Sequence, residues 1–178
     1  MINGTVRFLV AGALVNTLLA AGCSVPHKLA SKEDVLAREW NDPTAEKRVL
    51  ISSRSSEFKN EVVERIEEQL RGKKDVYVKV IGVEALEQED AAPYRAVVLV
   101  NTCVAWKMDP EIESFLEKHP ESDRIIVLTT SGDGEWKPKK DEQAFDTVTS
   151  ASKDYDPDAV ADQIVERVGR LLETAPAN

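Results

Sequence analysis

Side chains that could do chemistry gather directly after the short apolar runs of this sequence. These are the hydroxyl groups of Ser52 and Ser53, Thr102, residues 129–131 and residues 147–152. A serine becomes a nucleophile when a histidine accepts its proton, but the two histidines, His27 and His119, stand near none of these serines. The sequence therefore gives little support to a hydrolase. Two interpretations stay open: the hydroxyl groups bind a ligand, or they cap helices and satisfy turns.

The amino terminus has the pattern of a secretory signal peptide. Arg7 precedes an apolar run over residues 8–19, and small residues then lead to Cys23. The run is shorter than the roughly 20 apolar residues of a membrane-spanning helix. Its end, Leu19-Ala20-Ala21-Gly22-Cys23, resembles the bacterial lipobox. The resemblance implies that residues 1–22 are removed and that Cys23 carries lipid. Ser24 is similar to outer-membrane sorting signals, which implies a protein facing the periplasm if the host is Gram-negative.

Cys103 is the second of two cysteines. If Cys23 carries lipid, Cys103 has no intramolecular partner in an oxidising compartment. A free cysteine is more often a small buried hydrophobe than a reactive thiol, so burial is the preferred interpretation and a reactive thiol the alternative. The histidines have no ligand spacing, and we expect no metal site.

Composition limits the partners. The chain of 178 residues has a formal net charge of −9 and a pI near 4.9, so it lacks the basic patch of a nucleic-acid-binding protein. The acidic charge gives no attraction to an anionic membrane surface, so membrane attachment must come from lipid. Residues 23–46 are polar and predict a tether. A short helix is expected from Ser31, with Val35, Leu36 and Trp40 on one apolar face.

From residue 47 to residue 173 the sequence predicts one α/β domain, followed by a tail over residues 174–178. Apolar runs predict strands over residues 49–51, 76–81, 96–100, 125–128 and 145–150. Amphipathic segments between them predict helices, one closed by Gly72 and two opened by Asp109-Pro110 and Asp156-Pro157. Lys79 suggests that its strand lies at a sheet edge, and residues 129–142 are expected to form a loop. This alternation predicts a three-layer fold with a five-stranded parallel sheet.

Three segments of this domain resemble the flavodoxin-like family. Residues 94–108 and the helix with Phe115 and Leu116 are similar to the third strand, the flavin-flanking loop and the following helix. Residues 130–134 are similar to the turn after the fourth strand, and residues 52–56 to the phosphate loop. The resemblance implies that FMN or another ligand would contact the following side chains: Ser52, Ser53, Arg54, Ser55, Ser56, Asn101, Thr102, Trp106, Ser131, Gly132, Asp133 and Trp136.

The phosphate loop departs from the family pattern, which alternates hydroxyl residues with glycine. No glycine lies between Ser52 and Glu57, and Glu57 brings negative charge to the helix end where the phosphate would bind. Against this, Trp106 and Trp136 fall in the two loops that flank the flavin ring in flavodoxins. The preferred hypothesis is therefore a lipid-anchored envelope protein that binds a protein or small ligand without FMN. The alternative is an FMN-binding electron-transfer protein.

Overall fold

The computed structural model describes residues 33–103, 105–120, 123–131, 134, 145–151 and 156–174. Their elements are, in chain order, β1 (Arg38–Trp40), β2 (Lys47–Ser53), α1 (Glu57–Arg71), β3 (Val76–Ile81), the 3-10 helix η2 (Val83–Gln88), β4 (Ala96–Thr102), α2 (Pro110–Lys118), β5 (Ile125–Ser131), β6 (Asp146–Ala151) and α3 (Pro157–Glu173).

These strands form one sheet in the order β1-β3-β2-β4-β5-β6. The five strands from β2 to β6 are parallel, as the alternation of strands and helices predicted, and their order is the flavodoxin-like one. The sheet has a sixth strand that the sequence did not predict, because β1 pairs antiparallel with β3. The described sheet is therefore mixed, with a parallel core of five strands.

Strand β1 corrects the expected helix over residues 31–40 within its described part. The segment is extended: Arg38 lies opposite Val80, and Trp40 lies opposite Val78. Val35 and Trp40 pack against the core, whereas Leu36 is exposed. A ladder along the open edge of β3 satisfies the backbone of both strands, and this long-range gain outweighs the local helix signal.

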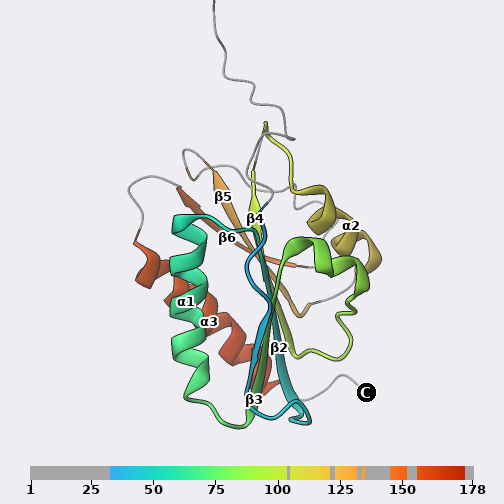
Figure 1. Cartoon of the computed structure of the whole chain (residues 1–178), viewed down its shortest axis with the longest axis vertical. Helices are drawn as coiled ribbons and strands as arrows, with labels where there is room; N and C mark the ends of the chain where they lie inside the picture. The colour runs from blue at the N-terminus through green and yellow to red at the C-terminus, as the bar shows by residue number, and fades with distance from the viewer. Residues whose placement is uncertain are drawn as a thin grey trace, which may run out of the picture.

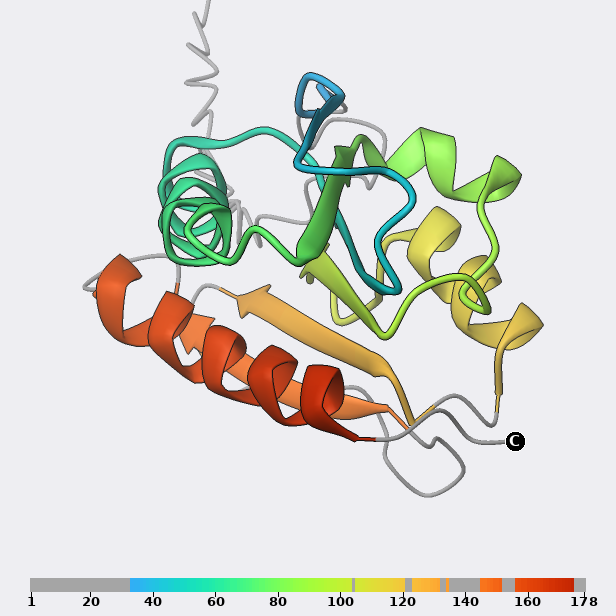
Figure 2. The ribbon, with the colours of Figure 1, turned by 90° about the horizontal axis from the view of Figure 1, so that it is seen from below.

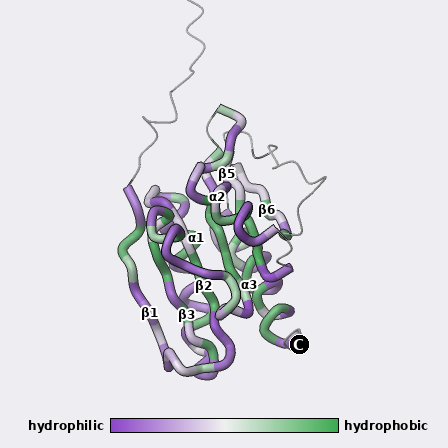
Figure 3. The backbone as a smooth tube through the Cα atoms, turned by 90° about the vertical axis from the view of Figure 1, so that its right-hand side faces the viewer, coloured by the Kyte–Doolittle hydropathy of each residue, from purple (hydrophilic) through white to green (hydrophobic). Residues whose placement is uncertain are grey.

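Two helical layers cover the sheet, with α1 and α3 on one face and η2 and α2 on the other (Figures 1 and 2). Alternate residues of β4 divide between the layers: Val98 faces α1 and α3, whereas Leu99 faces η2 and α2. In Figure 3 the hydrophobic residues, coloured green, are concentrated along the central strands. Burial on both faces explains why these strands are continuous apolar runs.

Two further expectations change. Lys79 is not at a sheet edge, because β1 and β2 flank β3, and its ammonium pairs with the Glu89 carboxylate. The fourth predicted strand continues to Ser131, three residues beyond the apolar run, so residues 129–131 belong to β5 rather than to a loop. Buried Thr129 and Thr130 extend the ladder with β4.

Candidate functional site

The carboxyl ends of β2, β4 and β5 meet at one edge of the sheet, which we call the carboxyl edge. In open α/β sheets ligands bind outside this edge. The structure brings together several of the predicted site residues there: Ser52, Ser53, Arg54, Asn101, Thr102 and Ser131. Ser55 and Ser56 follow immediately and lead into α1, for which Ser56 is the N-cap.

Arg54 is the centre of this edge, and its side chain is 5% exposed. Its guanidinium forms ion pairs with four carboxylates. Nε lies 3.0 Å from Asp109, Nη1 lies 3.1 Å from Asp34 and 3.3 Å from Glu84, and Nη2 lies 3.2 Å from Glu111. We call these five residues the Arg54 cluster. One cation faces four acidic groups, so the cluster has an excess of negative charge.

The described chain enters along this edge as a strap over residues 33–36. The Ser55 amide donates a 2.7 Å hydrogen bond to the Glu33 carbonyl, and the Val35 amide donates to the Ser53 carbonyl at 3.3 Å. Asp34 fixes the strap by accepting from the Glu84 amide at 3.0 Å as well as by pairing with Arg54. The strap therefore occupies one backbone donor, the Ser55 amide, at the position of the predicted phosphate loop.

Gly82 gives the strap room. A Cβ placed on this glycine would lie 2.3 to 2.5 Å from three side-chain atoms of Asp34. No real Cβ contact is that short, so the glycine is required by the close approach of Asp34 rather than by its backbone angles.

Lys59 is buried in the first turn of α1, beside the Arg54 cluster. Its Nζ donates a 2.7 Å hydrogen bond to Thr102 Oγ1. Burial lowers the pKa of Lys59 to about 8, helped by the positive charge of Arg54 and opposed by Asp109 and Asp34. Lys59 thus joins α1 to the end of β4, and it lies close enough to the Arg54 cluster to feel the charges of Arg54, Asp109 and Asp34.

The carboxyl groups of Asp109 and Glu111 interact at the start of α2. Burial raises the pKa of Asp109, but hydrogen bonds with Glu111 and Arg54 outweigh it and hold this pKa below its ordinary value. The Asp109 carboxylate in turn raises the pKa of Glu111. Asp109 is also the N-cap of α2, where it accepts from the Glu111 amide at 3.2 Å. Its own amide donates to Asn101 Oδ1 at 2.9 Å, which ties α2 to β4.

Most hydroxyl groups at this edge bond to the protein itself. Ser53 donates to the Arg54 carbonyl, Ser55 accepts from Asn60, Ser56 accepts from the Lys59 amide, and Ser131 accepts from the Gly134 amide. Ser52 Oγ is buried without a hydrogen-bond partner among the described residues. The turn-and-cap interpretation of the hydroxyl groups is therefore the better supported one at these positions.

Trp106 is exposed in the loop that follows β4, with 72% of its surface accessible. Ala105 and Trp106 both have left-handed backbone angles, with φ of 52° and 63°. Cys103 is half-buried, and its amide donates to the Thr130 carbonyl at 2.9 Å. Four predicted site residues lie outside the described residues: Cys23, Gly132, Asp133 and Trp136.

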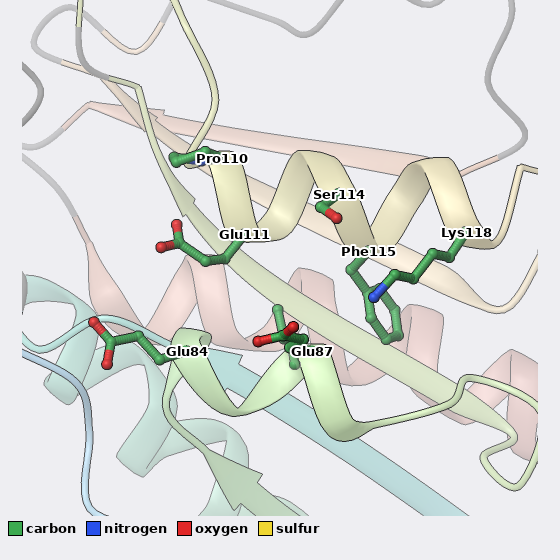
Figure 4. Close-up of a pocket in the computed structure, with 8 residues that line it drawn as sticks. Glu84, Glu87, Pro110, Glu111, Ser114, Phe115 and Lys118 are labelled. Carbon is green, nitrogen blue, oxygen red and sulfur yellow. The ribbon is translucent and has the colours of Figure 1, made fainter.

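A cleft of about 560 Å³ opens between η2 and α2, next to the Arg54 cluster (Figure 4). Its lining combines apolar and charged side chains: Glu84, Leu86, Glu87, Pro110, Glu111, Ser114, Phe115 and Lys118. Glu84 and Glu111 belong to both the cleft and the cluster. No three His, Cys, Asp or Glu side chains within the described ranges are arranged to hold a metal ion.

Sequence reasoning missed Lys59, Asp34 and the pairing of Arg54 with Asp109. Lys59 had a readable signal, since it lies three and four residues before Val62 and Val63 on the buried stripe of α1. Asp34 and Asp109 had none, because they are 20 and 55 positions from Arg54 and only the folded sheet brings them together.

No protein-family model matches the chain, and no curated protein matches it in sequence. Solved structures do match. An oxidoreductase from Corynebacterium diphtheriae is 11% identical with a TM-score of 0.50, over 72% of this chain and 96% of that one. A flavodoxin from the domain Archaea is 13% identical with a TM-score of 0.48, over 70% of this chain and 98% of that one.

A flavo di-iron protein mutant from Thermotoga maritima is 15% identical with a TM-score of 0.49 over 74% of this chain. The match spans only 37% of that longer protein. The Corynebacterium structure shares the overall fold of this chain, and the order of the five parallel strands is the flavodoxin-like one. At these identities the likeness concerns the fold alone. Among the described residues, no helix is long and apolar enough to cross a membrane.

Proposed function

We propose that this protein is anchored to the cell envelope by lipid on Cys23, and that its flavodoxin-like domain is a binding module without the usual phosphate contacts to FMN. The enclosed side chain of Arg54 carries the second part of this proposal. Arg54 is the one basic residue of the segment that resembles a phosphate loop, and four carboxylates surround it.

A phosphate at this edge would need backbone donors, and one of them is already used. Phosphate loops bind their ligand through backbone N–H groups at a helix start, and here the Ser55 amide donates to Glu33. A phosphate would also lie among the carboxylates of Asp34, Glu84 and Asp109, and like charges at short distance in a partly dry site repel strongly. These contacts favour a domain that does not distinguish FMN from riboflavin.

The cleft between η2 and α2 is where we propose that a ligand of this module binds. Its volume of about 560 Å³ lies in the range of small-molecule sites, and Phe115 and Leu86 give it apolar surface. A fragment screen by protein NMR tests this assignment. We expect the shifted amides to include those of Ser114 and Phe115. Fragments that bind only elsewhere contradict it.

Flavin binding is tested by titrating the purified protein with FMN and with riboflavin, following tryptophan emission and the visible spectrum. We expect weak or undetectable binding and no preference for FMN. A protein that is yellow on purification, or tight FMN binding that is lost in Ser55→Asp, contradicts the proposal.

Such a result would favour the second candidate function, an envelope-anchored electron carrier. The observation in its favour is Trp106, which is exposed in the loop after β4 and could stack on a flavin ring. In that case Trp106→Ala should weaken flavin binding several-fold.

The lipid anchor is tested by Cys23→Ser, with Cys103→Ser as the matched control. We expect the first variant to leave the membrane fraction or to keep its signal peptide, and the second to behave like the wild type. Mass spectrometry of the amino-terminal peptide should find acyl chains on Cys23. Unchanged size and partition of Cys23→Ser would contradict the anchor.

A further inference from the structure

Two large hydrophobic side chains are exposed in the described structure, Leu36 at 83% and Trp106 at 72%. Both lie near the carboxyl edge. Leu36 follows Val35, whose amide bonds to Ser53 at the end of β2. Trp106 lies four positions after Thr102, the last residue of β4. Since Ser53 lies opposite Val100 in the parallel pair of β2 and β4, Leu36 lies beside the sheet, whereas Trp106 lies beyond the end of β4.

Trp106 is exposed and has an uncommon backbone conformation. Ala105 and Trp106 are consecutive non-glycine residues with left-handed φ angles. Such conformations cluster at functional sites. Lys107 comes next and is exposed. An indole beside a long cationic side chain is the combination that occupies the boundary between lipid headgroups and acyl chains.

The strap connects this same edge to the proposed lipid. The described chain begins at Glu33, whose carbonyl accepts from the Ser55 amide at the carboxyl edge. Residues 23–32 join Cys23 to Glu33, and a fully extended chain of that length reaches about 35 Å at most. A lipid on Cys23 would therefore hold Glu33, and with it the carboxyl edge, within about 35 Å of the bilayer.

We propose that Trp106, with Lys107, forms a second contact with the membrane by inserting its indole into the headgroup region of the bilayer. This inference rests on the proposed lipid anchor. The contact depends on apolar surface rather than on net charge, because the acidic chain is not attracted to anionic lipid. The two contacts together would fix the orientation of the domain, with the carboxyl edge toward the bilayer.

Depth-dependent quenching tests the proposal on the full-length lipid-modified protein. The variant Trp40→Phe/Trp136→Phe retains Trp106 as its single tryptophan. Its matched control, Trp106→Phe/Trp136→Phe, retains Trp40. Trp40 lies toward the other end of the sheet, where Arg71 in the last turn of α1 stacks over its ring at 5.0 Å. Both variants are reconstituted in phosphatidylcholine vesicles, with or without bromine on the acyl chains near the headgroup.

We expect brominated lipid to quench Trp106 and to shift its emission to shorter wavelength, and to leave Trp40 unchanged. Protein that floats with the vesicles while Trp106 and Trp40 are equally unquenched overturns the membrane contact and leaves the lipid anchor standing. Protein that carries no lipid and stays out of the vesicles overturns both.

Discussion

The ammonium group of Lys59 donates a 2.7 Å hydrogen bond to Thr102 Oγ1, and this bond joins α1 to the carboxyl end of β4 inside the protein. The lysine is 5% exposed, and burial lowers its pKa from 10.5 to about 8. The domain therefore holds a buried cation that is costly at neutral pH and loses its proton under mildly alkaline conditions.

This pKa predicts a pH-dependent stability. Between pH 8 and 10.5 the unfolded chain keeps a proton on Lys59 that the folded protein has lost, so the free energy of unfolding rises with pH in this window. Lys59→Met removes the effect. Across the window, the difference between the two proteins in urea unfolding should change by on the order of 3 kcal/mol.

Lys47→Met is the matched control for this measurement, because it removes one lysine from the exposed pair with Asp75. If both variants gave the same trend with pH, the trend would come from the loss of any lysine charge, and the assignment to Lys59 would be wrong.

Arg54 is predicted to be essential for stability. Arg54→Met leaves four carboxylates facing one another without their cation, and breaking a buried ion pair in this way costs about 3–5 kcal/mol. Arg65→Met removes an arginine whose partners, Glu68 and Asp158, are exposed, and it should cost less than about 1 kcal/mol. Urea unfolding at neutral pH compares the two. Similar small losses would mean that the Arg54 cluster is not formed in solution.

Gly82→Ala should loosen the strap. Its new Cβ would meet Asp34 at 2.3 to 2.5 Å, so Asp34 must move away from Arg54 and from the Glu84 amide. Faster hydrogen exchange at the Ser55 and Val35 amides would report the release.

Gly169→Ala provides the control, since a Cβ there meets nothing within 4 Å and the position lies inside α3. Alanine in a helix should stabilise the protein by about 0.5–1 kcal/mol relative to glycine. Unchanged exchange at Ser55 in Gly82→Ala would show that the strap does not depend on this close approach.

Leu99→Ala should cost about 2–5 kcal/mol, because Leu99 is fully buried in the middle of β4. Lys79→Ala should cost about 1–2 kcal/mol. Lys79 is on β3, which is flanked by β1 and β2. Its ammonium pairs with Glu89, which also accepts a 2.9 Å hydrogen bond from Tyr94. Denaturant melts measure both losses. If Lys79→Ala changed the stability by almost nothing, Lys79 would behave as an ordinary surface residue, and its pair with Glu89 would not stabilise the protein.

The parallel strands could be predicted because the residues of each strand show by their own apolar side chains that the strand is buried. Residues 96–100 are apolar at every position, and β4 has a helical layer on each face. The start of α2 could be predicted for the same reason, since the neighbouring residues Asp109 and Pro110 cap this helix in the structure.

Strand β1 could not be predicted in this way. Arg38 and Trp40 become part of a strand only because β3 offers an open edge, and that edge exists only after residues 76–81 have folded into the sheet. The same is true of the candidate site. The position of the serine-rich segment suggested an anion site. The negative charges that surround Arg54 there belong to the protein itself, and two of them come from Asp34 and Asp109, which lie far from Arg54 in sequence.

Helix α3 carries the chain from the carboxyl edge back to the opposite end of the domain. It starts at Pro157 and ends at Glu173, a length of about 25 Å, and the Thr174 carbonyl accepts from Arg95 just before β4 begins. Figure 2 shows the red end of α3 and the blue start of the described chain on opposite sides of the molecule. A fluorescent reporter or affinity handle fused after Thr174 would therefore extend away from the strap, whereas one inserted ahead of Glu33 would lie beside it.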